Sequence, residues 1–392
     1  MNFNKINNRK NTNSIKWDGH EKMNVPQDCL PMWVADMDFQ TVPQVIEALT
    51  SLAQRGIYGY EFESNEYFQS VIGWMQRRHQ WNIKKEWIST TPGVVSAIHA
   101  CLMAFTQPGD AVMIQKPVYH PFSNSINRLN RKLINNALVE KDGHYGIDFE
   151  NFENLIMQNH VKMFILCSPH NPVGRVWTEE ELTRMADLCI RHQVLIVSDE
   201  IHMDFVFKPH RHHVLAGLKD HYQEHVITLT ASSKTFNLAG LKLSNTIISN
   251  PALKRKYDAV YDDLSVHAGH TFGLVATQAA YDHGDRYVDE MVEYLHDNLQ
   301  MTDAFFKEHC PKIKIIQPQG LYLIWVDFRG LGLKQRDLKE FLLKKAKLWL
   351  NDGVVFGKEG EGFQRINIAA PKTTIEKALN QLLSALKEEN LC

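Results

Sequence analysis

The chain has 392 residues, of which 44% are hydrophobic, and its 43 basic and 45 acidic side chains give a formal net charge of −2. This length predicts about two or three domains with large apolar cores. The near-neutral charge argues against a protein that wraps nucleic acid or lies on an anionic membrane. The hydrophobic content also excludes a largely disordered chain.

Apolar runs such as residues 321–326 are far shorter than the ~18 to 20 residues that a transmembrane helix needs. The Asn-rich start lacks the apolar stretch of a secretory signal, and we expect it to be frayed. These features predict a cytoplasmic protein. Six dispersed cysteines without a C-x-x-C pair are expected to be reduced core thiols, neither disulfides nor zinc ligands. They are Cys29, Cys101, Cys167, Cys189, Cys310 and Cys392.

Helical and strand-like segments alternate between about residues 64 and 285, which predicts a mostly parallel sheet with helices on its faces. Residues 64–81 carry apolar side chains at helical spacing. A capping box formed by Thr178 and Glu181 predicts the start of another helix. Short apolar runs predict buried strands at residues 111–114, 162–167, 194–198, 226–230 and 243–248.

After about residue 286 the pattern indicates a smaller α+β domain that starts with a long helix. A second capping box, at Thr373 and Glu376, predicts the closing helix. Strand-like segments are found between the two helices, at residues 312–316, 321–328 and 364–369. We therefore expect an α/β protein with a large domain at residues 45–285 and a small domain made of residues 1–44 and 286–392.

Four polar segments lie where ligands bind in such sheets, after strands or at the start of helices. They are residues 91–96 (TPGVVS), 168–174 (SPHNPVG), 197–202 (VSDEIH) and 230–236 (TASSKTF). Each is weak evidence alone, because Pro-Gly and Asn-Pro are common in turns and most lysines are solvated. The first nonetheless offers free N–H groups to a phosphate, and the last places a lysine, which can form a Schiff base with an aldehyde, among small hydroxyl residues.

Together, the four segments meet the chemical requirements of pyridoxal phosphate (PLP). A carboxylate must keep the pyridine nitrogen protonated, and Asp199 can supply it. Asn171 can donate to the 3-oxygen of the ring, and Tyr119 is the candidate for stacking on the ring face. Lys234 can hold the aldehyde.

The chain resembles PLP enzymes of fold type I, the class I/II aminotransferase superfamily, over essentially its whole length. It is most similar to the branch of cystathionine β-lyases, C–S lyases and maltose-regulon modulators. Residues 33–39 (WVADMDF), His202 and residues 235–237 (TFN) discriminate this branch, since ordinary aminotransferases usually have Tyr in place of His202. The resemblance also rests on residues 30–32, 58–60, 92–95, 171–177, 198–201, 233–234 and 362–367.

The resemblance implies further site residues. Arg365 is expected to bind the substrate α-carboxylate as a bidentate fork, and Tyr60 to reach the PLP phosphate of the neighbouring subunit in a homodimer. Lys234, Tyr119 and Tyr60 are the expected catalytic residues. Further expected contacts are Gly93, Val94, Val95, His202 and Ser232 for the cofactor, and Ala35 and Asn171 for the substrate.

The chain departs from the aminotransferase pattern at two positions near the expected phosphate. Ala231 lacks the hydroxyl that the pattern places three residues before the lysine, and Lys242 stands where an arginine often binds phosphate. Ser232 and Lys242 are the candidates to substitute. These departures concern the phosphate contacts and do not affect the assignments of Lys234 and Asp199.

The function implied by the resemblance is β-elimination from L-cystathionine, or from related cysteine S-conjugates, to a thiol (homocysteine), pyruvate and ammonia. Such an enzyme belongs to methionine biosynthesis. A class I/II aminotransferase is the alternative. A purely regulatory role also stays open, because the branch includes a modulator of a transcription activator, although nothing basic or resembling a helix-turn-helix supports DNA binding.

Other classes of enzyme fit less well. Asp199, Glu200, His202 and Asp204 lack H-E-x-x-H spacing, so a metal hydrolase is not expected. The histidines of residues 210–213 follow Pro209 in what we expect to be an exposed loop. A nicotinamide dehydrogenase would need a G-x-G-x-x-G segment after a strand, which the sequence lacks. We therefore expect no metal, nucleic-acid or membrane partner.

Overall fold

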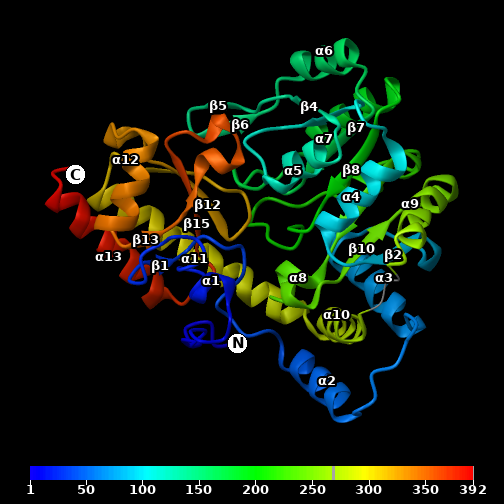
Figure 1. Ribbon diagram of the computed structural model, residues 1–392, viewed down its shortest axis with the longest axis horizontal. Helices are drawn as coiled ribbons and strands as arrows, with labels where there is room; N and C mark the ends of the chain where they lie inside the picture. Colours follow the sequence, from blue (N-terminus) through cyan, green and yellow to red (C-terminus); the bar gives the residue numbers. More distant parts are fainter. Residues whose placement is uncertain (267–269, 392) are drawn as a thin grey trace.

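The computed structural model describes residues 1–266 and 270–391. Its largest sheet has seven strands in the order β2-β10-β9-β8-β7-β3-β4 (Figure 1). Within this sheet, β10 runs antiparallel to β2 and β9, and the other neighbours are parallel. The prediction of a mostly parallel central sheet is confirmed. The strands are β2 (Ile88–Thr91), β3 (Ala111–Ile114), β4 (Lys132–Asn135), β7 (Met163–Cys167), β8 (Leu195–Asp199), β9 (Val226–Thr230) and β10 (Ser244–Ile247).

The sequence predicted the apolar, buried strands more accurately than the polar or edge strands. The apolar strands β3 and β9 begin and end where the sequence predicted them, and all their residues are buried. The sequence did not predict β2 and β4. The β2 sequence is polar (ISTT), and β4 is an edge strand with an exposed Lys132, so neither forms an apolar run.

Helices alternate with most of the strands of the large sheet along the sequence. The predicted capping box is present at the start of α7, where Thr178 and Glu181 exchange hydrogen bonds with each other's backbone N–H groups. The helices are α2 (Pro43–Gln54), α3 (Asn65–His79), α4 (Val94–Phe105), α5 (Pro121–Arg128), α6 (Phe149–Asn159), α7 (Glu179–Arg191), α8 (Ser232–Thr235), α9 (Pro251–Asp263) and α10 (Thr271–His283).

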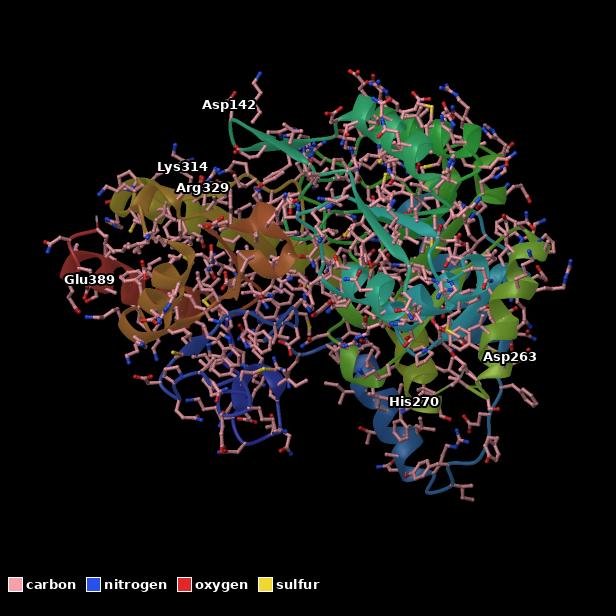
Figure 2. The ribbon with its side chains drawn as sticks, turned by 45° about the horizontal axis from the view of Figure 1, so that its top comes forward. Asp142, Asp263, His270, Lys314, Arg329 and Glu389 are labelled. Atoms are coloured by element: carbon pink, nitrogen blue, oxygen red, sulfur yellow. The ribbon has the colours of Figure 1, made fainter. Side chains whose placement is uncertain are left out.

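A second, antiparallel sheet has four strands in the order β11-β12-β15-β14. Figure 2 shows Lys314, Arg329 and Glu389 on the side of the molecule that holds this sheet, and Asp263 and His270 on the other side. Its strands are β11 (Lys314–Ile316), β12 (Leu323–Asp327), β14 (Asn351–Asp352) and β15 (Phe363–Asn367), and the helices around it are α11 (Asp285–His309), α12 (Gln335–Glu340) and α13 (Lys372–Glu388).

The N-terminal segment lies beside these C-terminal elements (Figure 1). β1 (Leu30–Pro31) pairs in parallel with β13 (Leu348–Trp349). α1 (Ile15–Asp18) precedes β1 in the sequence. A separate hairpin is formed by β5 (Val139–Lys141) and β6 (His144–Gly146).

The expectation that the Asn-rich start is frayed was wrong. Phe3 is buried, and its ring lies 5.1 Å from that of Phe39. Lys16 is also buried and donates to Asp38 at 2.8 Å. The polar residues of the segment are thus held by ion pairs with a distant acidic segment, which local composition does not reveal.

The second predicted capping box was also wrong. α13 begins at Lys372 with Pro371 as its N-cap, so Thr373 already lies inside the first turn. Five of the six cysteines are buried as expected, namely Cys29, Cys101, Cys167, Cys189 and Cys310, whereas Cys392 lies outside the described residues. None of the helices in the described part of the chain is long and apolar enough to cross a membrane.

Candidate active site

A cavity of about 370 Å³ lies at the carboxyl ends of the central strands, and all four polar segments singled out in the sequence contribute to its wall. Because parallel strands end at a common edge, segments that are distant in the sequence meet there. The volume suits a small organic ligand. The predicted residues that line the cavity are Ala35, Gly93, Val94, Val95, Tyr119, Asn171, Asp199, His202 and Lys234.

Lys234 extends from the single turn α8, which follows β9. Its Nζ donates a hydrogen bond to the carbonyl oxygen of Ala35 at 2.8 Å. Burial and the nearby Arg365 guanidinium lower the pKa of Lys234 to about 8. A pKa of about 8 leaves roughly one tenth of the amine neutral at pH 7, far more than for an ordinary lysine. The site therefore raises the fraction of the amine that is in the neutral, nucleophilic form.

Asp199 ends β8 and lies in the same wall. Its Oδ1 accepts a hydrogen bond from the backbone N–H of Ile201 at 3.2 Å. Burial raises the pKa of Asp199 to about 7. A buried carboxylate with one weak backbone donor is stabilised when a cationic donor enters the cavity beside it.

Arg365 lies on β15 of the smaller sheet; it does not itself line the cavity but bonds to Asn171, which does. Its guanidinium donates to Asn171 Oδ1 at 3.1 Å and to the carbonyl oxygen of Trp33 at 2.8 Å. The Nε atom is buried and finds no hydrogen-bond partner among the described residues. Burial lowers the pKa of Arg365 to about 10, so the group stays charged at neutral pH. The remaining donor capacity is suited to a carboxylate.

Tyr119 and Asn171 form one structural unit. The backbone N–H of Tyr119 donates to the carbonyl oxygen of Asn171 at 3.1 Å. Burial raises the pKa of Tyr119, which keeps its hydroxyl protonated. The unit places an aromatic ring and an amide side chain in the wall of the same cavity.

The start of α4 forms another part of the wall. Gly93 is the N-cap with φ of 101°, a backbone conformation that residues with a side chain rarely adopt. The free N–H groups of the first turn of this 12-residue helix, which begins at Val94, suit an anion. Ser233 and Lys242 also line the cavity.

Ser232 differs from the other predicted cofactor contacts. Its hydroxyl forms a hydrogen bond with Thr277 Oγ1 at 2.7 Å, and its side chain is buried away from the cavity wall. Of the two candidate phosphate contacts at the departures from the aminotransferase pattern, Lys242 lines the cavity, whereas the Ser232 side chain attaches α8 to α10. The neighbouring Ser233 and Ser96 of α4 also line the cavity, and sequence reasoning assigned neither of them as a contact.

Tyr322 is a second residue that sequence reasoning missed. Its hydroxyl donates to the carbonyl oxygen of Ala35 at 3.1 Å, the same oxygen that accepts from Lys234. Its ring lies 6.1 Å from that of His202. His202 is buried, its Nδ1 lacks a partner within the described residues, and burial lowers its pKa well below the usual value. In the sequence, Tyr322 is one aromatic residue in an apolar strand and gives no separate signal.

Tyr60 lies on the exposed segment between α2 and α3, and its side chain is fully accessible. In Figure 1 this segment loops out from the body of the molecule after α2. Tyr60 does not line the cavity of its own chain. Its predicted role at the neighbouring subunit stays a prediction.

The expectation of an exposed histidine loop was partly wrong. His210 and Arg211 are exposed, but His212 is buried. Its Nε2 lies 2.7 Å from Oε2 of the fully buried Glu200. The described residues contain no group of three or more His, Cys, Asp or Glu side chains arranged to hold a metal ion. This histidine thus pairs with a carboxylate in the core.

Comparisons with known proteins identify the class. The family model for aminotransferases of class I and II matches residues 27–382, and the chain belongs to this family. It is 40% identical to cystathionine beta-lyase PatB of Bacillus subtilis over 98% of this chain and 100% of that protein. It is 31% identical to protein MalY of Escherichia coli, with 98% of each chain covered.

Solved structures of similar proteins superpose closely on this fold. Cystalysin from Treponema denticola, whose structure contains a pyridoxal 5'-phosphate cofactor, superposes with a TM-score of 0.96 at 38% identity and 99% coverage of both chains. A PLP-bound putative aminotransferase from Clostridium difficile also has a TM-score of 0.96, at 41% identity over 98% of this chain and 100% of that one.

Proposed function

We propose that this protein is a PLP-dependent C–S β-lyase that cleaves L-cystathionine, and related cysteine S-conjugates, to a thiol (homocysteine), pyruvate and ammonia. The observation that carries the proposal is the meeting of Lys234, with a pKa of about 8, and Asp199, with a pKa of about 7, in one cavity. Relatives that carry the name cystathionine beta-lyase support the choice of a lyase over an aminotransferase.

The cavity residues fit the cofactor. Lys234 would hold the aldehyde, and Asp199, which lacks a charged hydrogen-bond donor among the described residues, would pair with the ring nitrogen. Asn171 and Tyr119 would contact the 3-oxygen and the ring face. The phosphate would bind at the N-terminus of α4, beside Ser233 and Lys242.

The reaction needs a proton removed from the substrate Cα and a thiolate expelled from Cβ. PLP, when bound, supplies a protonated ring that withdraws electrons from Cα. Asp199 would pair with the ring nitrogen through its carboxylate and favour its protonated form. Lys234 would accept the Cα proton, and its lowered pKa makes the neutral base accessible near pH 7. Arg365 orients the substrate by binding its α-carboxylate.

We also propose a homodimer in which Tyr60 reaches the phosphate site of the neighbouring chain. Four large apolar side chains on the segment that carries it are exposed in the single chain: Ile57, Tyr58, Tyr60 and Phe62. Burial of such a group against a second copy would remove apolar area from water.

We add three further assignments to the proposal. They are a cytoplasmic location, a role in methionine biosynthesis, and division of the chain into a large domain (45–285) and a small one (1–44 with 286–392). The parallel pairing of β1 with β13 supports assigning the N-terminus to the small domain.

The experiment that tests the proposal supplies L-cystathionine without any 2-oxo acid. A lyase makes pyruvate, ammonia and homocysteine over many turnovers, because the cofactor is regenerated in each cycle. A single stoichiometric burst, rescued by added 2-oxoglutarate or pyruvate, would show an aminotransferase instead. Lys234→Ala is the inactive reference, and Lys219→Ala, which changes an exposed lysine paired with Asp187, is the matched control.

A further inference from the structure

The turn that carries Lys234 is too short to hold its own shape. α8 consists of Ser232–Thr235 alone, and an isolated helical turn is unstable because it fixes several dihedral angles for one hydrogen bond. Its conformation must therefore come from contacts with other elements. On the N-terminal side, Ser232 is tied to Thr277 of α10 at 2.7 Å.

On the C-terminal side, the turn is held by a buried chain of three side chains. Thr235 Oγ1 donates to Asp204 Oδ2 at 2.6 Å, and His79 Nε2 lies 2.9 Å from Asp204 Oδ1. Thr235 is fully buried, and the side chains of Asp204 and His79 are 3% and 5% exposed. Both carboxylate oxygens of Asp204 are thus engaged, one by α8 and the other by the last residue of α3.

Electrostatics favour an ionised Asp204 at the centre of this chain. Burial alone would raise its pKa, but the hydrogen bonds from His79 and Thr235 outweigh burial and leave the pKa lowered. Burial lowers the pKa of His79, so at neutral pH the ring donates as a neutral group. A hydrogen bond to a carboxylate is about twice as strong as one between neutral groups. Thr235 therefore makes the stronger of the two hydroxyl attachments of the turn.

The location of Asp204 connects these hydrogen bonds to the cavity. Asp204 lies in the turn that follows β8 and so belongs to the same segment as Asp199. The bond to Thr235 joins this segment to the residue directly after Lys234. It thereby fixes the lysine relative to the carboxylate across the cavity.

We propose that Asp204, held by His79, is a positioning residue that acts through Thr235 to orient Lys234 toward Asp199 and the reacting atoms. The proposal rests on the proposed function, since it assumes that Lys234 holds the cofactor and moves the Cα proton. Neither Asp204 nor Thr235 lines the cavity, so their effect is exerted through the position of Lys234.

The test compares three variants of the PLP-loaded enzyme. Thr235→Val removes the hydroxyl and keeps the shape, whereas Thr235→Ser keeps the hydroxyl and removes a methyl group. Thr228→Val is the matched control, because the buried Thr228 hydroxyl of β9 has no hydrogen-bond partner in the described part of the chain. We measure kcat and KM for L-cystathionine, and the circular dichroism of the visible cofactor band per bound PLP, which reports the orientation of the cofactor independently of turnover.

For Thr235→Val we expect kcat to fall about tenfold or more while KM changes less than about twofold, since misplacement of a reacting group chiefly slows the chemical step. The visible dichroism should fall with kcat, and Thr235→Ser should restore both. The proposal is overturned if Thr235→Val matches Thr228→Val in both measurements, or if Thr235→Ser is as impaired as Thr235→Val. If Thr235→Val does not unfold cooperatively, Thr235→Ala replaces it under the same criteria.

These outcomes are separable from failure of the proposed function. The unmodified enzyme is assayed first for the visible band and for sustained pyruvate release. Absence of either refutes the proposed function before any variant is compared. If both are present but Thr235→Val has the kcat and the visible circular dichroism of the Thr228→Val control, only the positioning role is refuted.

Discussion

Replacing Arg365 with lysine tests the proposed substrate-binding site most directly. The guanidinium is buried and already donates to Asn171 and to the carbonyl oxygen of Trp33. Its planar fork leaves further N–H groups for a carboxylate, whereas a lysine ammonium in the same place cannot serve all these acceptors in one fixed geometry. Arg365→Lys therefore keeps the charge and removes the bidentate contact.

The size of the effect follows from the bonds involved. A hydrogen bond between charged groups contributes about 1.5 to 3 kcal/mol. With 1.36 kcal/mol for each tenfold change, losing one such bond lowers kcat/KM about 10- to 150-fold. Arg329→Lys is the control, because Arg329 lies on the surface beside the small sheet and bonds to Asp327 at 2.7 Å (Figure 2).

The assay measures kcat/KM for L-cystathionine and for an amine analogue that lacks the α-carboxylate. In the unmodified enzyme, kcat/KM for L-cystathionine should exceed kcat/KM for the amine analogue by about the same factor by which Arg365→Lys lowers kcat/KM for L-cystathionine. In the variant, the ratio between the two substrates should be far smaller. Melting temperatures check that each variant is folded. A value of kcat/KM within twofold of the parent enzyme, at an unchanged preference for the carboxylate, would refute the assignment of Arg365.

Lys234→Ala should abolish turnover and retain PLP without a covalent bond, and borohydride reduction followed by peptide mapping should label Lys234 in the parent enzyme; a label on another lysine would contradict the assignment. Asp199→Asn should bind cofactor but lose most activity, because an amide does not hold the ring nitrogen protonated; near-parental rates would exclude Asp199 as the ring partner. Tyr60→Phe should weaken PLP retention, and mixing it with Lys234→Ala should restore some activity through hybrid dimers, whereas failure of exchanging mixtures to complement would place Tyr60 outside a shared site. In cofactor-free protein, acylation of the Lys234 amine should rise with pH through a midpoint near 8, because burial disfavours the ammonium form; a midpoint near the ordinary lysine pKa of 10.5 would contradict this environment.

The sequence alone identified the central chemistry because its signals are local. Lys234 and Asp199 each directly follow an apolar run that forms a buried strand, β9 for the lysine and β8 for the carboxylate. Since the carboxyl ends of parallel strands meet at one edge, the alternating pattern placed both groups in one cavity. The same reasoning placed the start of α4, which we propose binds the phosphate, in the wall of the same cavity.

Contacts between residues far apart in the sequence were decided only by the tertiary structure. Arg365 reaches Asn171 from a different sheet, and Tyr322 shares the carbonyl oxygen of Ala35 with Lys234. Local patterns also misjudged the N-terminal segment, where Lys16 is buried against Asp38.

The physical reason is that periodicity reports which face of an element is buried and says nothing about the partner that covers it. Thr235 and Asp204 illustrate this limit. Each is a polar residue after an apolar strand, and their bond of 2.6 Å exists because β8 and β9 are adjacent in the folded sheet. Strand order therefore determines how Lys234 is held, and strand order is a property of the whole chain.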